Sequence, residues 1–402
     1  MKFFEHSTRR AEIIDLRHDA RMGVWGGFTK DARRIQGLDM LRGVAVALVM
    51  LRHAWPDTFD GAGIVGVAIF FTLSGYLITG LIVREIERTG TLRKARFFRN
   101  RALRLFPAIA ALFVVYAVVE ITFGPGGDSN ETIGKTVLIG ATYTANLPLG
   151  ISPTLGHIWS LATEEQFYLV WPFLILFTRR WLRPVVICLL VTAWLTVLCW
   201  SSLLIVNNAS SIYALPTTWG SALAFGGIGY TLRNRISAHL GRRLSTVAAI
   251  GAIVLLVLSF VPDAKTAAAT YILWPTLIAA ASLAVIFVVA QWEILPSSAL
   301  APLLWLGEIS YGVYLWNLPV NVWLTAALGG DLAGWKWVTI PMTIAAALVS
   351  WYTVELVGRH YRDRFDSRQS PPPLISDIHT PRKSSLFGIP KDGTATGTSE
   401  RV

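Results

Sequence analysis

The chain has 402 residues, of which 53% are hydrophobic and only 15% are charged. Soluble proteins carry about 25% charged residues, so the composition excludes an ordinary soluble domain. Its repeated apolar runs of about 20 residues are long enough to cross a hydrocarbon core of roughly 30 Å. The net charge of +11 does not indicate nucleic-acid binding, because the basic residues are concentrated between the apolar runs, as in the positive-inside pattern of membrane proteins.

These features predict an all-α polytopic membrane protein with about ten transmembrane helices in one membrane domain, residues 37–358. Residues 1–36 carry charges of both signs, which predicts a cytoplasmic N-terminal arm without a cleavable signal peptide. Residues 359–402 are rich in Pro, Ser, Thr and Gly and predict a disordered cytoplasmic tail. The expected spans are 38–55, 62–83, 105–123, 166–178, 184–206, 212–232, 244–261, 267–290, 300–326 and 336–357.

The charges of the connecting segments set the expected topology. Residues 84–104 hold eight Arg or Lys against two Glu, which marks this segment as cytoplasmic. Residues 133–149 form a short run that contains Lys135, and short runs are more often re-entrant or interfacial than spanning. A re-entrant segment also keeps the basic residues 179–183 on the cytoplasmic side. We therefore expect both termini inside, in the inner (plasma) membrane of a bacterial cell.

No motif for a metal or a soluble-enzyme nucleophile is visible. Cys188 and Cys199 share one apolar run, with neither a CxxC motif nor clustered histidines, so we expect no disulfide framework and no metal site. The sequence has no GxSxG elbow, no GxxxxGK[ST] loop and no HExxH motif.

Arg42 and His53 lie in one apolar run, residues 38–55. An ionisable group inside such a run costs roughly 2.5–3.5 kcal/mol and marks a functional candidate. Eleven residues are close to three helical turns, so both side chains face the same way, about 16 Å apart along the axis. Histidine is suited to general-base catalysis, and arginine can hold a phosphate or an oxyanion. In the alternative interpretation, both side chains extend to opposite membrane interfaces, although the neighbouring Arg52 could do so alone.

Arg101 and Arg104 are three residues apart and therefore neighbours on one helix face, where the basic segment enters the third span. Two guanidinium groups at the membrane interface can bind phosphates. The alternative is that they anchor the topology or contact lipid headgroups.

Glu164 and Glu165 stand at the start of an apolar helix, after His157 and before Tyr168. Acidic residues in a first helical turn favour the helix dipole, and Thr163 could cap that helix. This explanation accounts for one carboxylate more easily than for two. We therefore treat Glu164 and Glu165 as catalytic candidates, and His157 and Tyr168 as residues of a substrate cavity.

Ser74 and Tyr76 flank Gly75 in the middle of the second span. Small residues in a span usually indicate close helix packing. The polar side chains of Ser74 and Tyr76 could also line a cavity.

These segments together resemble the membrane acyltransferase 3 family, whose members O-acylate glycans, lipids and secondary metabolites. The resemblance covers residues from about 36 to 358, and its segments occur in the family's order. The matching stretches are GLDMLRGVAVALVMLRH (37–53), GVAIFFTLSGYLIT (66–79), FFRNRALRLFP (97–107), HIWSLATEEQFYLVWP (157–172) and ISYGVYLWNLP (309–319).

The resemblance implies ten spans, an acyl-CoA donor on the cytoplasmic side and an acceptor hydroxyl that is often on the far side. It identifies Arg42 and His53 with the family's Arg-x10-His pair, and Arg101 and Arg104 with its Arg-x-x-Arg pair. Either Glu164 or Glu165 matches the family's acidic position. Tyr311 and Tyr314 match its SYG-x-YL segment and join the cavity candidates.

Two departures from the family pattern change what can be expected. Many members have a histidine where this chain has Trp316–Asn317, and Asn317 can hydrogen-bond but cannot titrate. Asn317 is therefore a cavity candidate and not a second catalytic imidazole. The last span retains Glu355 without the proline that usually follows two residues later. We also expect a stand-alone transferase without an appended SGNH-type esterase domain.

We therefore expect an O-acyltransferase that moves an acyl group, most simply acetyl, from acyl-CoA to a hydroxyl of a glycan, glycolipid or related acceptor. Acyl-CoA would be a co-substrate, with no permanently bound cofactor. His53, paired with Glu164 or Glu165, would act as general base or, in a variant, as a transient acyl carrier. Arg101 and Arg104 would bind the phosphates of coenzyme A, and Arg42, a catalytic candidate, would hold the pantetheine-phosphate of the donor or polarise its thioester.

Two other classes of protein compete with this interpretation. A transporter or flippase for a lipid-linked sugar or anion also needs polar residues inside the membrane. Such proteins often contain a duplicated half, and no internal repeat is visible here. A membrane sensor would be expected to carry a folded soluble domain, which this chain lacks.

Overall fold

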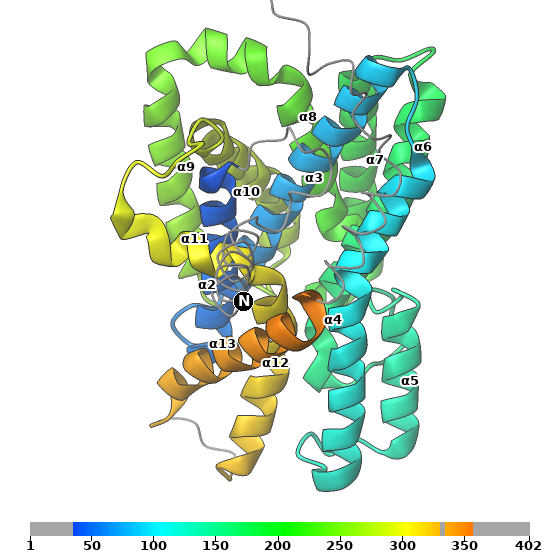
Figure 1. Ribbon diagram of the computed structural model, residues 1–402, viewed down its shortest axis with the longest axis vertical. Coiled ribbons are helices and arrows are strands. Elements are labelled where there is room, and N and C mark those ends of the chain that lie inside the picture. The colour runs from blue at the N-terminus through cyan, green and yellow to red at the C-terminus, as the bar shows by residue number, and fades with distance from the viewer. Residues whose placement is uncertain (1–34, 330–333, 357–402) are drawn as a thin grey trace, which may run out of the picture. The chain divides into compact units, whose positions relative to one another are not determined.

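The computed structural model describes residues 35–329 and 334–356, and these residues form helices and connecting loops without a strand (Figure 1). The predicted arm lies outside the described residues apart from its last two, and the predicted tail lies wholly outside them. The α-helices are α2 (Gln36–Ala54), α3 (Ala62–Thr89), α4 (Lys94–Phe123), α5 (Asn130–Ala141), α6 (Trp159–Thr178), α7 (Pro184–Ile205), α8 (Pro216–Leu240), α9 (Leu244–Ser259), α10 (Ala268–Val289), α11 (Ala301–Glu308), α12 (Ser310–Ala327) and α13 (Thr339–Ser350).

Local sequence explains where several helices begin and end. Pro184 and Pro216 stand at the first positions of α7 and α8, where a missing N–H and a fixed φ cost nothing. Gly90 and Gly124 adopt left-handed conformations, with φ of 73° and 57°, just after α3 and α4. Such a residue closes the last turn of a helix. The Ser129 hydroxyl accepts a hydrogen bond from the Thr132 amide and so caps α5.

Six helical segments of the described residues are long and apolar enough to cross a membrane. They are Ala62–Thr89, Lys94–Phe123, Pro184–Ile205, Pro216–Ser259, Ala268–Val289 and Lys336–Val354. The chain is therefore an all-helical multi-pass membrane protein, as predicted. The remaining expected spans include α2 and α6, which carry the ionisable residues of interest, and the number ten and the re-entrant segment stay predictions.

α3 occupies the middle of the bundle and packs against α2, α8 and α10 (Figure 1). α2 also packs against α11 and α12. The first helix of the described chain thus packs against helices from near its end. This arrangement brings candidate residues from distant parts of the sequence within reach of one another.

Small residues allow the helix backbones to touch at two crossings. A Cβ added to Gly43 in α2 would lie 1.9 Å from the carbonyl oxygen of Leu303, and one added to Gly307 would lie 1.8 Å from that of Asp39. A Cβ on Gly75 would lie 1.7 Å from the carbonyl oxygen of Leu223 in α8. The close packing predicted around Gly75 is confirmed, and the first crossing fixes the helix that carries Arg42 and His53.

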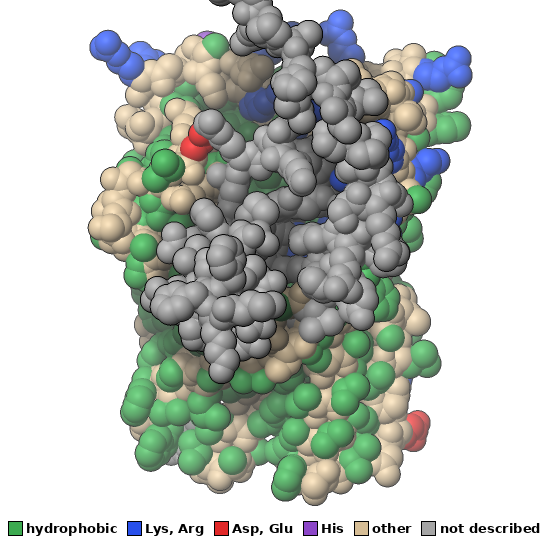
Figure 2. All heavy atoms as spheres, viewed as in Figure 1, with side chains coloured by type: hydrophobic (Ala, Val, Ile, Leu, Met, Phe, Trp, Pro, Cys, Tyr) green, Lys and Arg blue, Asp and Glu red, His purple; other side chains and the backbone are tan. Residues whose placement is uncertain are grey.

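Charge is unevenly distributed on the face seen in Figure 2. Lys and Arg side chains gather toward the upper edge, where α3 ends and α4 begins, and hydrophobic side chains dominate the lower half. Apolar side chains of α4, including Val114, Val118 and Ile121, are more than half exposed in the isolated chain. Such a surface suits contact with lipid tails.

Replacement of Gly43 by alanine should disrupt the crossing of α2 and α11, because the new methyl group would overlap backbone atoms that cannot move aside. Overpacking of this kind costs about 1–3 kcal/mol or more. We expect a lower thermal unfolding midpoint and a smaller monodisperse fraction in detergent. Gly134→Ala in α5 is the matched control, because nothing lies within 4 Å of its added Cβ; equal behaviour of the two variants would contradict the packing argument.

Candidate functional site

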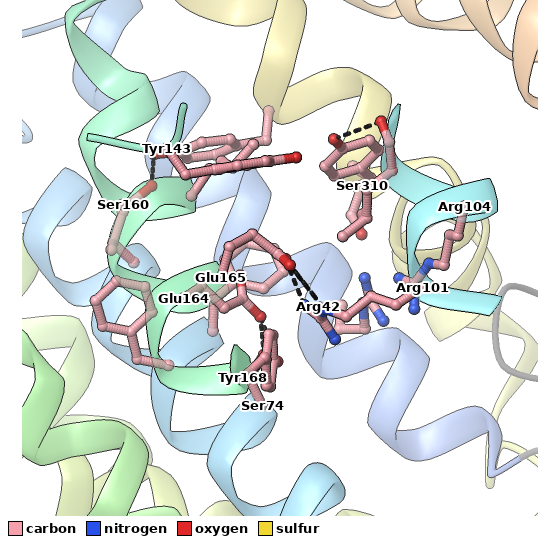
Figure 3. A pocket seen from close by; sticks show the side chains of 17 residues that line it. Arg42, Ser74, Arg101, Arg104, Tyr143, Ser160, Glu164, Glu165, Tyr168 and Ser310 are labelled. Carbon is pink, nitrogen blue, oxygen red and sulfur yellow. Dashed lines mark hydrogen bonds and ion pairs between the residues drawn. The ribbon is translucent and has the colours of Figure 1, made fainter. Parts of the chain in front are cut away.

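A pocket lies between α2, α3, α4, α6 and α12, and we call it the arginine pocket (Figure 3). In the close-up, the guanidinium groups of Arg42, Arg101 and Arg104 gather beside the carboxylates of Glu164 and Glu165. The candidates that the structure brings together here are Arg42, Ser74, Arg101, Arg104, Glu164, Glu165, Tyr168, Tyr311 and Tyr314.

A bidentate ion pair between Arg101 and Glu165 joins α4 to α6 in this pocket. Arg101 Nε donates to Glu165 Oε2 at 2.9 Å, and Arg101 Nη2 donates to Oε1 at 2.6 Å. The Arg101 guanidinium carbon lies 3.2 Å from the centre of the Tyr168 ring. Both charged side chains are mostly buried, with 13% and 20% exposed. Glu165 therefore holds Arg101 in one orientation, and Tyr168 supports it from the other side.

Glu164 has different partners. The hydroxyl of Ser74 donates to its Oε1 at 2.6 Å, and the hydroxyl of Tyr168 donates to the same oxygen. The capping interpretation of this segment is wrong, because α6 begins five residues earlier, at Trp159, and its first turn contains no acidic residue. Thr163 lies inside the helix and donates to the Trp159 carbonyl oxygen.

A second pocket contains His53 and His157, and we call it the histidine pocket. Three charged side chains line it as well: Arg52, Asp60 and Lys265. Its cavity volume is about 370 Å³, against about 70 Å³ for the arginine pocket. Arg42 and His53 thus line different cavities along one helix.

Asn317 orients the ring of His53. The Asn317 Nδ2 group donates to the hydroxyl of Thr343 at 3.3 Å, so its Oδ1 faces Nδ1 of His53. That oxygen can only accept, and Nδ1 must therefore carry the proton. The lone pair of His53 is left on Nε2.

The expected pairing of His53 with Glu164 or Glu165 is not formed. Both carboxylates line the arginine pocket and are engaged by Arg101, Ser74 and Tyr168, whereas His53 lines the histidine pocket. The sequence could place an acidic residue near the membrane interface but could not say which side of the bundle it would face. An amide takes the place of the expected carboxylate beside the imidazole.

Tyr314 lies between the two pockets and lines both of them, as does Val67 of α3. The Tyr314 hydroxyl donates to the carbonyl oxygen of His157 at 2.9 Å and shares a hydrogen bond with the Ser160 hydroxyl at 2.5 Å. These bonds hold the Tyr314 ring across the boundary.

His157 is fixed by its other ring nitrogen. Nε2 lies 3.1 Å from the carbonyl oxygen of Leu315 and therefore donates to it. Its Nδ1 is buried and has no hydrogen-bond partner among the described residues. His157 thus presents an acceptor atom in the same pocket as His53.

The other cavity candidates lie outside both pockets. Tyr76 packs against Tyr230 and Phe287 and lines a third cavity, with Arg233 and Gln291. Ser74 and Tyr76 are close in sequence, but their side chains line different cavities: Ser74 lines the arginine pocket and Tyr76 lines this third one. Asn317 contacts His53 and lines neither pocket.

Sequence reasoning missed three residues of the histidine pocket, namely Arg52, Asp60 and Lys265. Arg52 was interpreted as an interfacial anchor. With both termini inside, the connection between the expected spans 244–261 and 267–290 lies outside, and the basic Lys265 there departs from the positive-inside pattern. This exception was the available signal. Within the described ranges, no group of three or more His, Cys, Asp or Glu side chains could hold a metal ion.

Comparisons with known proteins agree on one family. A family model described as an acyltransferase domain matches residues 35–355. The chain is 30% identical to the peptidoglycan O-acetyltransferase OatA of Listeria monocytogenes over 326 residues, 73% of this chain and 50% of that protein. It is also 30% identical to the O-acetyltransferase OatA of Staphylococcus aureus over 339 residues, 74% of this chain and 54% of that protein. The chain therefore spans about half the length of these relatives, and no solved structure matches it.

Removal of one partner of the Arg101–Glu165 pair should destabilise the fold more than removal of both. Glu165→Ala leaves a buried guanidinium without its carboxylate, a change that typically costs about 3–5 kcal/mol. Replacement of both residues by methionine removes the charge and keeps the volume. We expect the thermal unfolding midpoint in detergent to fall most for Glu165→Ala and to recover in the double variant. A double variant as unstable as Glu165→Ala would contradict a dominant role for the unpaired charge.

Proposed function

Since the chain belongs to the acyltransferase 3 family and is an acyltransferase, we propose that it moves an acyl group, most simply acetyl, from acyl-CoA to a hydroxyl of an envelope glycan. The observation that carries this proposal is the pair of pockets separated by Tyr314, one lined by arginines and the other by His53. A transferase needs a site for each substrate and a point at which their reacting atoms meet.

The arginine pocket would bind the donor. Arg101 and Arg104 stand at the end of the basic segment, where the local potential attracts the phosphates of coenzyme A, and guanidinium forks match phosphate oxygens. The narrow cavity suits a thin pantetheine chain better than a nucleotide. Arg42, farther along the donor, would bind the pantetheine arm.

The histidine pocket would bind the acceptor, and its larger volume suits a sugar ring. Nε2 of His53 carries the lone pair and would take the proton of the acceptor hydroxyl as its oxygen attacks the thioester carbonyl carbon. The C–S bond then breaks, and the proton passes from His53 to the departing sulfur of coenzyme A. In the less direct variant, His53 first accepts the acyl group and then passes it to the hydroxyl.

Tyr314 would control the access of the donor thioester to the acceptor hydroxyl. Arg42 and His53 are about 16 Å apart along α2, so one small molecule cannot bridge them, but a donor with a long arm can. The thioester end would reach past Tyr314 into the histidine pocket. With Tyr314 across the boundary, water in the larger cavity is kept from the thioester until an acceptor is bound.

The proposed orientation puts the arginine pocket toward the cytoplasm, with ten spans, a re-entrant segment near 133–149 and both termini inside. Support comes from the basic residues gathered where α3 ends and α4 begins (Figure 2). The positive-inside pattern assigns that end to the cytoplasm, where acyl-CoA is made. The acceptor would then be modified at the opposite side of the membrane. Because the relative from Listeria is named as a peptidoglycan O-acetyltransferase, peptidoglycan is the first acceptor to test.

The proposed reaction predicts that His53→Ala abolishes acyl transfer. Membranes that contain the intact protein should incorporate label from isotopic acetyl-CoA into the glycan fraction, and the variant should lose at least about 100-fold of the rate. His239→Ala is the control, because His239 is exposed at the end of α8. The variants must be compared at matched expression. Label that is unchanged in His53→Ala would exclude this base, and transport of an intact glycan without use of any acyl-CoA would point to a transporter.

The Asn317 contact predicts a positioning role that can be separated from folding. Asn317→Ala should leave His53 free to change tautomer and rotamer, and should lower kcat about 10- to 100-fold with little change in the donor KM. Asn321→Ala, one turn farther along α12, removes a bond to the Asn317 carbonyl oxygen without touching His53. If both variants lost the same fraction of kcat, the effect of Asn317→Ala would come from a general destabilisation of α12, and the positioning role of Asn317 would be excluded.

A further inference from the structure

The histidine pocket carries more positive than negative charge. Its charged lining residues are Arg52, Lys265 and Asp60. Arg52 Nη2 lies 2.8 Å from Asp60 Oδ1, and Asp60 Oδ2 accepts a hydrogen bond from the Ala264 amide, also at 2.8 Å. Both oxygens of the single carboxylate are therefore engaged. Asp60 neutralises Arg52 and leaves the ammonium group of Lys265 without an equal counter-charge.

Lys265 is held in place despite the absence of an ion-pair partner. Among the residues that the structure describes, no carboxylate lies within ion-pair distance of its ammonium group. The nitrogen lies 4.5 Å from the centre of the Tyr213 ring, and Tyr213 lines the same pocket. The carbonyl oxygen of Lys265 accepts a hydrogen bond from the Tyr271 hydroxyl, and the preceding amide is bound by Asp60. The loop thus presents one cation in a fixed position.

The setting of Lys265 is costly for a charge. Burial and the nearby Arg52 lower the pKa of Lys265 from its ordinary value, since both disfavour the charged form. His53 lines the same cavity and offers no negative charge to offset the ammonium group. A cation that is withdrawn from water without a partner gains the most when an anion arrives.

We propose that the histidine pocket recognises an acceptor that carries an anionic group, a carboxylate or a phosphate, which binds Lys265 while the hydroxyl to be acylated faces Nε2 of His53. This inference rests on the proposed function and adds the chemical class of the acceptor. An anion on Lys265 would also fix the sugar in one orientation, so that a single hydroxyl approaches the imidazole. A neutral glycan of the same size would lack this contact.

Two disaccharides provide a matched pair of probes. The disaccharide of N-acetylglucosamine and N-acetylmuramic acid differs from di-N-acetylchitobiose by a lactyl ether that bears a carboxylate. N-acetylglucosamine 1-phosphate and N-acetylglucosamine form the corresponding pair for phosphate. Binding to the purified full-length protein in lipid nanodiscs would be measured by calorimetry without acyl-CoA, so that affinity is read independently of catalysis.

We expect the intact protein to bind the anionic member of at least one pair at least tenfold more tightly, since a charge-assisted hydrogen bond in a buried site contributes about that much. Lys265→Gln should remove the difference and leave the affinity for the neutral member unchanged. Lys135→Gln is the control, because Lys135 is exposed on α5 outside both pockets. The pair that shows the difference identifies the anion.

Three results would overturn the inference. The first is equal affinity of the intact protein for the two members of both pairs. The second is an equal loss of affinity for neutral and anionic probes in Lys265→Gln, as a structural defect would cause. The third is binding of inorganic phosphate and acetate as tight as that of the sugars. Transfer assays with the same probes separate the two proposals. An anion preference in binding without any acyl transfer would sink the proposed function alone, and transfer to both members at equal KM would sink the anionic acceptor alone.

Discussion

The ion pair between Arg101 and Glu165 is the interaction on which the site depends. It ties α4 to α6 inside an apolar bundle, where an unpaired charge would be expensive. Tyr168 packs on the guanidinium and also donates to Glu164, so the two acidic residues are held by one small network. This network fixes one wall of the arginine pocket. Without it, the buried guanidinium of Arg101 would lose its counter-charge.

In the histidine pocket too, charges are withdrawn from water and need partners, but among the described residues not every cation there has one. There Asp60 pairs with Arg52, and the remaining cation is steadied by an aromatic ring and an anchored loop. The arginine pocket is narrow, and an ion pair between Arg101 and Glu165 forms part of its wall. The histidine pocket is wider, and the ammonium group of Lys265 remains available in it. Tyr314 stands between them, and its hydrogen bonds to Ser160 and His157 link the boundary to the helix that carries the acidic residues.

The cost of ionisable groups in apolar segments, together with the family resemblance, was enough to select most residues of the candidate site from sequence. Arg42 and His53 stood out because little else in their run was polar, and nine candidates do line one pocket. The partner of His53 was predicted wrongly. His53 was expected to pair with Glu164 or Glu165, but the orientation of α6 turns both carboxylates toward Ser74 and Arg101. Residue type in the sequence indicates the chemistry of a side chain, whereas its contacts depend on the direction in which the folded helix points it.

By itself, the sequence determined that this chain is helical, that it belongs in a membrane and which ionisable residues are candidates for its site, because each follows from hydropathy and charge along a single segment. Tertiary structure decided how those residues divide between two pockets, that Asn317 sets the tautomer of His53, and that Lys265 joins the pocket of His53. These contacts span up to 264 residues of sequence. No local pattern encodes them, since they depend on how closely packed helices, such as α2 and α11 at Gly43, rotate their faces toward one another.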